Sequence, residues 1–404
     1  MSRVVVVGAS VAGVNCALSL RSFGFRGKVC LVEEEQIDEP YDKPPLSKEF
    51  LTGRLDTEGI SLLSESRARE ADLTLLSGHS AVGLDLTERA VLVDNHAPFH
   101  YDKLVIATGS RARPSPWKSM SGIYSLRSLD DALAIRAELV SGRRLIVIGA
   151  GFIGAEVAAT ARGLGVKVTV VDPLSTPMAR IFDPEVGNRF AQLHHRHGVE
   201  MLFGTGVDQM ERDGGEIRVR LTTGRVLAAD FVVVGIGSVP NDDWLRSSGI
   251  PLDDGILCDA RGLVKGQSAV YAIGDVARWT HPRDGFATRL EHWTNALEQA
   301  ACVANNIANP NSQRTHHPVE YVWSDQYDWR IQVAGRTDGS AAQTTITGPK
   351  ADQFAVLFND TEGNLRGGVT VNWSRAMVYC RKAIITGGSA SDIEALLGNV
   401  SQRR

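Results

Sequence analysis

Cysteine is scarce in this sequence, and its few copies are scattered. The 404 residues include five of them, Cys16, Cys30, Cys258, Cys302 and Cys380. No two stand in a CxxC or CxxxxC spacing, which argues against a zinc or iron–sulfur site built from neighbouring thiolates. A disulfide framework is also improbable in a chain of this length. We therefore expect five buried thiols that pack as small hydrophobic groups.

The sequence also lacks an excess of positive charge and long apolar runs. Lys and Arg number 43 against 47 Asp and Glu, which gives a net charge of −4. A nucleic-acid-binding protein is not expected, because that function needs a basic surface. No apolar stretch reaches the length of a membrane span, and the chain opens on valines without the basic region of a secretory signal. These absences predict a cytoplasmic protein without a membrane partner.

Two segments of the sequence resemble each other. Residues 4–20 read VVVVGASVAGVNCALSL, and residues 145–161 read LIVIGAGFIGAEVAATA. Each begins with β-branched residues typical of a buried parallel strand, continues through glycines into a helical stretch, and precedes an apolar strand that ends in an acid. Hairpin-like strands and a strand ending in glycine follow each, at residues 87–109 and 216–237. The sequence therefore predicts two βαβ nucleotide-binding domains of related construction.

The second segment carries a complete GxGxxG motif. Its first glycine permits a tight turn, its second lets the backbone approach a pyrophosphate, and its third lets helix and strand pack closely. The acid that ends the next strand can bind a ribose and would repel a 2′-phosphate, which favours NADH unless Arg180 folds back to offset it. The predicted NAD contacts are Gly149, Gly151, Ile153, Gly154 and Asp172.

The first segment departs from the motif, because it reads Gly8, Ser10 and Gly13. Serine is small enough for a phosphate to approach, and its hydroxyl can donate a hydrogen bond to it. Glu33 and Glu34 end the following strand, and either can bind a ribose. Two dinucleotide sites in one chain indicate an electron relay between a tightly bound flavin and a visiting nicotinamide.

A third candidate lies in AVYAIGDVAR, residues 269–278. Asp275 follows an apolar strand and a glycine, a position from which it can bind a ribityl hydroxyl of the flavin. A turn aspartate that caps a helix is the other interpretation. The two glycine motifs favour the flavin role.

Seven motifs together carry a family resemblance: GASVAG, PYDKPPLSK, LVIATG, LIVIGAGFIGAE, VYAIGDVA, EHWTNALEQA and VWSDQY. The chain resembles the FAD-dependent ferredoxin reductases of Rieske oxygenase and cytochrome P450 systems, within the glutathione-reductase-like superfamily. The resemblance covers essentially the whole chain. It implies an α/β fold of two Rossmann-like domains, one inserted in the other, with a C-terminal α+β domain. The implied boundaries are 1–112 with 241–319 for the FAD-binding domain, 113–240 for the NAD-binding domain and 320–404 for the C-terminal interface domain.

The resemblance also implies which residues contact FAD. Each of these residues is assigned to one part of the cofactor. They are Ala12 at the pyrophosphate, Glu34 at the adenosine ribose, Ala81 at the adenine, Arg127 at the hinge into the NAD domain, Asp275 at the ribityl chain and Trp293 beside the pyrimidine end of the flavin.

Residues 40–50, PYDKPPLSKEF, form a stiff segment, because proline restricts its own backbone and that of the preceding residue. The resemblance places Lys48 of this segment against the isoalloxazine, where an ammonium favours the electron-rich reduced ring. It places Glu156 at the nicotinamide carboxamide, paired with Lys48. Trp323 is expected to shield the flavin near the surface that meets the redox partner.

The implied function is that of an NADH:ferredoxin oxidoreductase, as a monomer or dimer. NADH gives hydride to FAD, and single electrons pass to a ferredoxin-type iron–sulfur protein that serves an oxygenase. Two alternatives stay open. An NADH oxidase or disulfide reductase normally carries a reactive cysteine in the segment that corresponds to residues 40–50, and this segment has none. An apoptosis-inducing-factor-like flavoprotein is disfavoured by the lack of a targeting presequence and of a basic surface.

The docking patch for an acidic ferredoxin is not evident, because the helix after NALEQA carries no positive charge. A cluster of His194, His195 and His197 precedes Gly198, and its spacing differs from HExxH. We expect a solvated helix end there rather than a metal site, and we predict no metal. The basic residues that remain candidates for docking are Arg289, Arg330, Arg336, Arg381 and Lys382.

Overall fold

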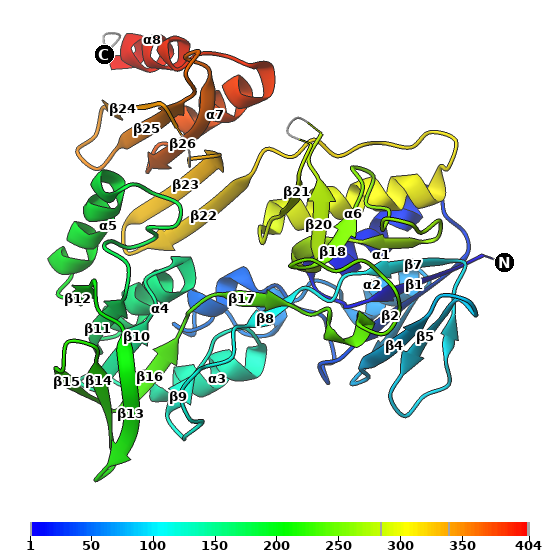
Figure 1. Ribbon diagram of the computed structural model, residues 1–404, viewed down its shortest axis with the longest axis horizontal. Coiled ribbons are helices and arrows are strands. Elements are labelled where there is room, and N and C mark those ends of the chain that lie inside the picture. The colour runs from blue at the N-terminus through cyan, green and yellow to red at the C-terminus, as the bar shows by residue number, and fades with distance from the viewer. Residues whose placement is uncertain (1, 283–284, 338–339, 402–404) are drawn as a thin grey trace. The chain divides into compact units, whose positions relative to one another are not determined.

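The computed structural model describes residues 2–282, 285–337 and 340–401. Its contacts divide the chain into two compact units (Figure 1). The first consists of Met1–Lys43, Asp56–Arg111 and Ser238–Pro318, and the second of Pro44–Leu55, Ala112–Gly237 and Val319–Arg404. The Pro44–Leu55 segment therefore belongs to the second unit, although its sequence neighbours on both sides belong to the first.

The core of the first unit is a parallel sheet in the strand order β19-β7-β1-β2-β3. The predicted βαβ arrangement is present, because β1 pairs in parallel with β2 and the helix α1 connects them. Helix α6 lies beside α1 (Figure 1). The bounds are β1 Arg3–Val7, α1 Val11–Ser22, β2 Lys28–Glu33, β3 Leu73–Ser77, β7 Lys103–Ile106, β19 Val270–Ala272 and α6 Trp293–Ala308.

Smaller sheets and one short helix complete the first unit. β4, β5 and β6 form an antiparallel sheet in that order, and β20 lies between β18 and β21. The strands β8 and β17 pair where the chain leaves this unit and returns to it. The bounds are α2 Glu65–Glu70, β4 Ala81–Asp85, β5 Ala90–Val93, β6 Phe99–His100, β8 Ser110–Ala112, β17 Ser238–Pro240, β18 Ile256–Cys258, β20 Ala277–Thr280 and β21 Ala287–Arg289.

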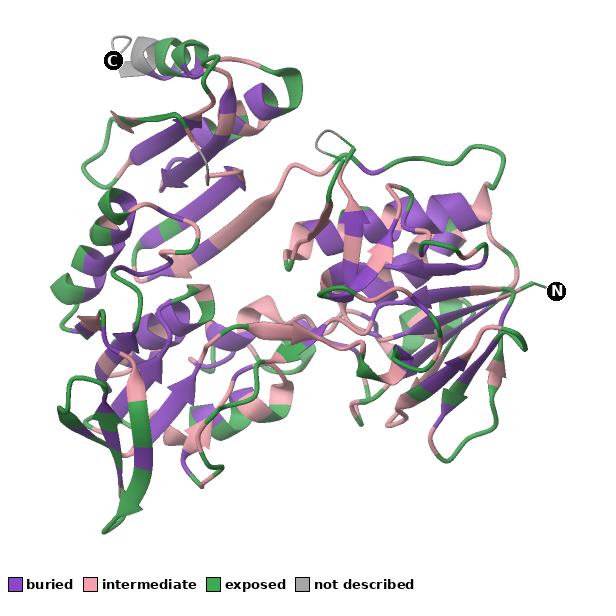
Figure 2. Cartoon of the chain, viewed as in Figure 1, coloured by how far each residue is buried: buried purple, intermediate pink, exposed green. Residues whose placement is uncertain are grey.

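The second unit contains the other predicted βαβ arrangement, in a parallel sheet of order β12-β11-β10-β16-β9. Figure 2 shows that β10 and β16 are buried, whereas the hairpin strand β13 is largely exposed. The bounds are β9 Ile123–Tyr124, α3 Leu129–Glu138, β10 Arg144–Ile148, α4 Phe152–Gly163, β11 Lys167–Asp172, α5 Pro184–Arg196, β12 Glu200–Phe203, β13 Val207–Asp213, β14 Glu216–Leu221, β15 Val226–Ala229 and β16 Phe231–Val234.

Helix α3 begins with a capping box and ends without a glycine cap. The Ser128 hydroxyl accepts the Asp131 N–H, and the Asp131 carboxylate accepts the Ser128 N–H, which completes a capping box. The helix ends at Glu138, so Gly142 is not its cap. Gly142 instead turns the chain into β10, with a φ of 86° that favours glycine.

An antiparallel sheet of order β22-β23-β26-β25-β24 forms the C-terminal part of the second unit. Alternate side chains of β25 face opposite sides: Val356 packs with α5 residues such as Phe190, and Leu357 packs with α7 residues such as Met377. Figure 1 shows α5 beside β22 and β23. The bounds are β22 Tyr321–Gln326, β23 Trp329–Gly335, β24 Ala342–Thr347, β25 Phe354–Asn359, β26 Leu365–Val371, α7 Ser374–Thr386 and α8 Ala390–Ser401.

All five cysteines are buried and free, as the sequence predicts. Burial raises the pKa of Cys16 and Cys380 to about 12, and that of Cys30 and Cys302 to about 11. Because the thiolate is the reactive form, these side chains are chemically inert at neutral pH. Of the helices within the described ranges, none combines the length and the apolar character needed to cross a membrane.

The expectation of a solvated histidine cluster is wrong for His194. This residue lies in the last turn of α5 but is fully buried, whereas His195 and His197 are exposed. The C-terminal sheet packs over this side of α5 and covers the imidazole. Burial lowers the pKa of His194 to about 4 and has the same effect on His316 in the first unit.

These two histidines predict a loss of stability in mild acid. Below pH 6.5 each of these histidines takes up a proton in the unfolded chain. In the folded protein both imidazoles stay neutral down to about pH 4. The free energy of unfolding should therefore fall by about 1.4 kcal/mol per pH unit for each group, in the unit that contains it. Thermal unfolding midpoints between pH 8 and pH 5 measure this. The unfolding midpoint of His194→Gln should fall less steeply with decreasing pH than that of wild type. Parallel plots of midpoint against pH for the two proteins would contradict the assignment.

Candidate functional site

The glycine turn of the second unit leaves open space at its middle position. A Cβ on Gly149 would lie 2.2 Å from the Gly235 carbonyl oxygen, and one on Gly154 would lie 2.0 Å from the Gly149 oxygen. Among the described atoms, none lies within 4 Å of the position that a Cβ on Gly151 would take. The first and third glycines are therefore required by packing, and the middle one borders space at the N-terminus of α4 that a pyrophosphate can fill.

The glycine turn of the first unit has the same construction. A Cβ on Gly8 would lie 2.3 Å from the Ala107 oxygen, and one on Gly13 would lie 1.9 Å from the Gly8 oxygen. Ser10 is the N-cap of α1, but within the described residues its hydroxyl makes no capping hydrogen bond. A side chain is tolerated at this middle position because packing does not require glycine there, and the hydroxyl is available to a phosphate.

The acids that end β2 and β11 make matching contacts. Asp172 accepts the N–H groups of Ala150 at 2.7 Å and of Leu174 at 2.8 Å. Glu33 accepts the N–H groups of Ala9 at 2.6 Å and of Glu35 at 3.0 Å. In each case one donor directly follows the first glycine of the turn, and the other lies two residues after the acid.

Glu33 is therefore the structural counterpart of Asp172. Burial raises the pKa of the Glu33 carboxyl, whereas Glu34, which the resemblance selects, is exposed. The sequence offered both glutamates, and their local pattern gave no means to tell which one faces the glycine turn. The choice of Glu34 for the ribose stays a prediction.

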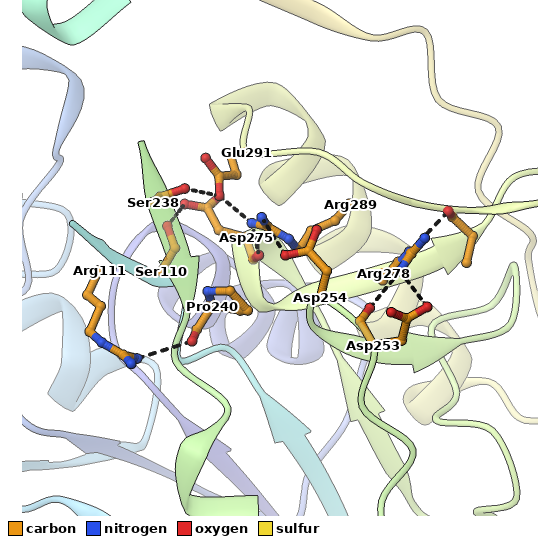
Figure 3. Close-up of polar contacts among 11 residues, drawn as sticks. Ser110, Arg111, Ser238, Pro240, Asp253, Asp254, Asp275, Arg278, Arg289 and Glu291 are labelled. Atoms are coloured by element: carbon orange, nitrogen blue, oxygen red, sulfur yellow. Dashed lines mark hydrogen bonds and ion pairs between the residues drawn. The ribbon is translucent and has the colours of Figure 1, made fainter. Parts of the chain in front are cut away.

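The GD turn of residues 274–275 meets the first glycine motif. A Cβ on Gly274 would lie 3.0 Å from that of Ala12, and the Gly274 N–H donates to Gln299 of α6 at 2.8 Å. Asp275 accepts a hydrogen bond from the Ser110 hydroxyl at 3.1 Å (Figure 3). Two of the predicted FAD motifs, far apart in the sequence, are thus brought together within the first unit.

The remaining residues predicted to bind FAD lie on separate elements. Trp293 is the first residue of α6, and its indole N–H donates to Asp42 at 2.9 Å. Ala81 begins β4, next to a bulge in its pairing with β5. Arg127, in the second unit, directly precedes the N-cap of α3. Their roles at the cofactor stay predictions.

A buried ion pair lies on the nucleotide helix α4 of the second unit. Lys48 Nζ is 2.8 Å from Glu156 Oε2, and the two side chains are 13% and 5% exposed. The Ser47 hydroxyl also donates to Oε2, at 2.5 Å, and the Thr160 hydroxyl donates to the Ser47 carbonyl at 2.8 Å. The predicted pairing is present, and α4 fixes the segment that carries Lys48.

The opposite side of Glu156 is covered by β22, which carries the WSDQ motif. Ser324 donates to Glu156 Oε1 at 2.6 Å. Trp323, one residue earlier, is half-buried, with its ring stacked 6.2 Å from that of Tyr321. The family resemblance points to the tryptophan of this motif but not to the serine, whose small polar side chain gives no signal on its own.

Two of the basic docking candidates are not free surface cations. Arg289 is 12% exposed and forms ion pairs with Glu291 and, at 3.1 Å, with Asp254 (Figure 3). Arg336 is 22% exposed and pairs with Glu320 at 3.1 Å. The exposed members of the set are Arg330, Lys382 and, in part, Arg381.

Known families account for nearly all of the chain. Residues 2–300 match the family described as pyridine nucleotide-disulphide oxidoreductase, and residues 321–398 match the reductase C-terminal family. The chain belongs to the pyridine nucleotide-disulphide oxidoreductase family. This family uses FAD with NAD(H), so the predicted cofactors and enzyme class are confirmed. The two family matches also confirm the predicted fold class.

Similar members of the family are reductases of electron carriers. The chain is 36% identical over 387 residues to rhodocoxin reductase of Rhodococcus erythropolis, covering 95% of this chain and 89% of that one. It is 34% identical over 385 residues to the ferredoxin reductase component of chlorobenzene dioxygenase from Cupriavidus sp. (strain PS12), covering 95% and 92%. The crystal structure of the covalent putidaredoxin reductase–putidaredoxin complex matches with a TM-score of 0.92 at 29% identity, covering 98% and 99%. The predicted family resemblance is thereby confirmed.

The open space at Gly151 predicts a variant that folds but binds nucleotide poorly. Gly151 has an extended backbone that valine adopts readily, and its added side chain meets only the space assigned to the pyrophosphate. We expect Gly151→Val to keep the wild-type unfolding midpoint and to raise the Kd for NADH at least about tenfold. Gly154→Ala is the contrasting variant, because its Cβ collides with the Gly149 carbonyl and should destabilise the fold. Unchanged NADH affinity in Gly151→Val would contradict the assignment.

Proposed function

We propose that the protein is an NADH-dependent flavoprotein reductase of a ferredoxin-type iron–sulfur protein that serves an oxygenase. The observation that carries this proposal is the Lys48–Glu156 ion pair, held on the nucleotide helix by a segment without cysteine. A disulfide or peroxide reductase needs a reactive thiol, and the five thiols of this chain are buried. The names of the relatives, which are reductases of rhodocoxin and of a dioxygenase ferredoxin, support the same class of acceptor.

The residues of the chain bind and orient the cofactors, whose own chemistry is redox. When bound, FAD accepts a hydride from NADH and passes electrons singly to the iron–sulfur protein. We assign the turn from Gly8 to Gly13 to the FAD pyrophosphate and Asp275 to the ribityl chain. Lys48 supplies a positive charge that stabilises the reduced flavin, and Glu156 contacts the nicotinamide carboxamide.

The nucleotide we propose is NADH rather than NADPH. The Asp172 carboxylate is fixed by two backbone N–H groups at the end of β11, where it would repel a 2′-phosphate. Arg180 does not offset this charge, because its guanidinium lies about 4.0 Å from the Cβ position of Gly237. Gly237 follows β16, and β10 lies between β16 and β11, the strand that ends in Asp172.

The function predicts two half-reactions that can be measured separately. Anaerobic addition of NADH to the purified holoprotein should bleach the flavin spectrum, with NADPH at least about tenfold less effective. Addition of a [2Fe–2S] ferredoxin from a dioxygenase system, with cytochrome c as the final acceptor, should then give turnover. Rapid reduction of peroxide or a disulfide without ferredoxin turnover would contradict the proposal. A long-lived NADH charge-transfer complex with negligible ferredoxin activity would favour the apoptosis-inducing-factor-like alternative.

Lys48 is predicted to accelerate flavin reduction without being needed to bind FAD. We expect Lys48→Ala to keep its FAD and to reduce the flavin roughly 100-fold more slowly with NADH, because the charge beside the reduced ring is lost. Stopped-flow absorbance measures the rate, and Lys118→Ala, an exposed lysine of the same unit, is the matched control. A wild-type rate in Lys48→Ala would remove Lys48 from the mechanism.

A further inference from the structure

A chain of buried hydrogen bonds runs from Tyr327 to the Glu156 carboxylate within the second unit. The Tyr327 hydroxyl is 3.1 Å from His194 Nδ1, and His194 Nε2 is 3.0 Å from Gln326 Oε1. Gln326 Nε2 donates to Ser324 Oγ at 3.1 Å, and Ser324 donates to Glu156 Oε1 at 2.6 Å. The side chains that form this series of hydrogen bonds come from four elements: α4, α5, β22 and the turn after β22.

The carboxylate fixes the direction of the inner bonds. At 2.6 Å from a carboxylate oxygen, Ser324 must donate its only proton to Glu156. Gln326 must then present its NH₂ group to Ser324, because the reversed amide would need the same hydroxyl proton. The amide oxygen of Gln326 therefore faces His194 and can only accept.

The direction of the outer bonds follows from the histidine. Since Gln326 Oε1 accepts, the proton of the neutral His194 ring must lie on Nε2. Burial, which lowers the pKa of His194 to about 4, keeps the ring neutral at physiological pH. Nδ1 is then an acceptor, and the Tyr327 hydroxyl donates to it. Burial raises the pKa of Tyr327, so this hydroxyl keeps its proton. In every hydrogen bond of this series, the donor therefore lies on the side of Tyr327 and the acceptor on the side of Glu156.

The outer end of the chain is held by a strained turn. Tyr327 has a φ of 55°, a left-handed conformation that is uncommon for a large aromatic residue. Its ring stacks on His197 with a centroid distance of 3.8 Å and an interplanar angle of 2°. A backbone in this region is strained and persists where the surroundings over-determine it. The stacking and the bond to His194 both hold the Tyr327 side chain.

We propose that Ser324, Gln326, His194 and Tyr327 are positioning residues that set the orientation of the Glu156 carboxylate for nicotinamide binding. The role of Glu156 rests on the proposed function. Lys48 and Ser47 hold only Oε2, and the terminal torsion of a glutamate is otherwise broad. Ser324 holds Oε1 and so prevents rotation, and the outer residues hold Ser324. The C-terminal sheet is therefore a functional part of the nucleotide site.

The first test removes the hydroxyl that holds Oε1. We expect Ser324→Ala to raise the Kd for NADH about tenfold, while the holoprotein keeps its FAD and its unfolding midpoint within a few degrees. The rate at which ferricyanide oxidises the dithionite-reduced variant should match that of wild type, because the series of hydrogen bonds acts only on the nucleotide half-reaction. Ser324→Thr, which retains a hydroxyl, should restore most of the affinity.

A matched control lies in the same sheet. The Thr370 hydroxyl on β26 is fully buried and, among the described residues, has no hydrogen-bond partner, so Thr370→Val removes a buried hydroxyl outside the chain. NADH affinity should be unchanged in this variant. Equal losses in Thr370→Val and Ser324→Ala, or equal losses in both half-reactions, would overturn the proposal. These measurements use NADH and ferricyanide, so they stand even if ferredoxin is not the physiological acceptor.

The second test reads the direction of the chain without relying on activity. Two-bond ¹⁵N–¹H correlations in the ¹⁵N-histidine-labelled holoprotein report which ring nitrogen carries the proton, and the His194 signals are those absent in His194→Gln. We expect the neutral Nε2–H tautomer from pH 5.5 to pH 8. Tyr327→Phe, at the far end, should weaken NADH binding about twofold. A neutral Nδ1–H tautomer, or a protonated ring at pH 7, would refute the proposed polarity.

Discussion

The arrangement of the second unit depends on one buried carboxylate. Glu156 is 4% exposed, and a buried charge destabilises a fold unless donors surround it. Its donors come from two distant parts of the sequence, namely Ser47 with Lys48, and Ser324 of the C-terminal sheet. This requirement accounts for why the Pro44–Leu55 segment belongs to the second unit, away from its sequence neighbours. The same contacts that compensate the charge also fix its direction.

The two glycine turns show how one construction serves two ligands. In both units the first glycine is required by the backbone that follows a neighbouring strand, and the third is required by the carbonyl of the first. The differences lie at the middle position, which is Ser10 in one turn and Gly151 in the other, and in the acids Glu33 and Asp172. Each acid accepts the N–H of the residue that follows the first glycine of its turn. The positions that packing fixes are thus separate from the middle position, which we propose contacts the dinucleotide.

Local patterns were sufficient to predict the elements. The β-branched runs and the glycine spacing each depend on residues within a few positions of one another, and the structure contains both. The absence of closely spaced cysteines likewise predicted inert, buried thiols. The family resemblance added the pairing of Lys48 with Glu156, which no local pattern contains. The three-domain boundaries and the cofactor roles of single residues stay predictions.

The sequence by itself therefore determined the two nucleotide-binding folds, because strand and helix formation follow short periods of polarity. Only the tertiary structure decided which polar side chains act together. His194 lies 132 residues from Gln326, and Ser324 lies 168 residues from Glu156. At that separation no period links the partners, and the histidines at the end of α5 resemble a solvated helix end. The C-terminal sheet buries His194, and an imidazole removed from water has to form its hydrogen bonds with the protein.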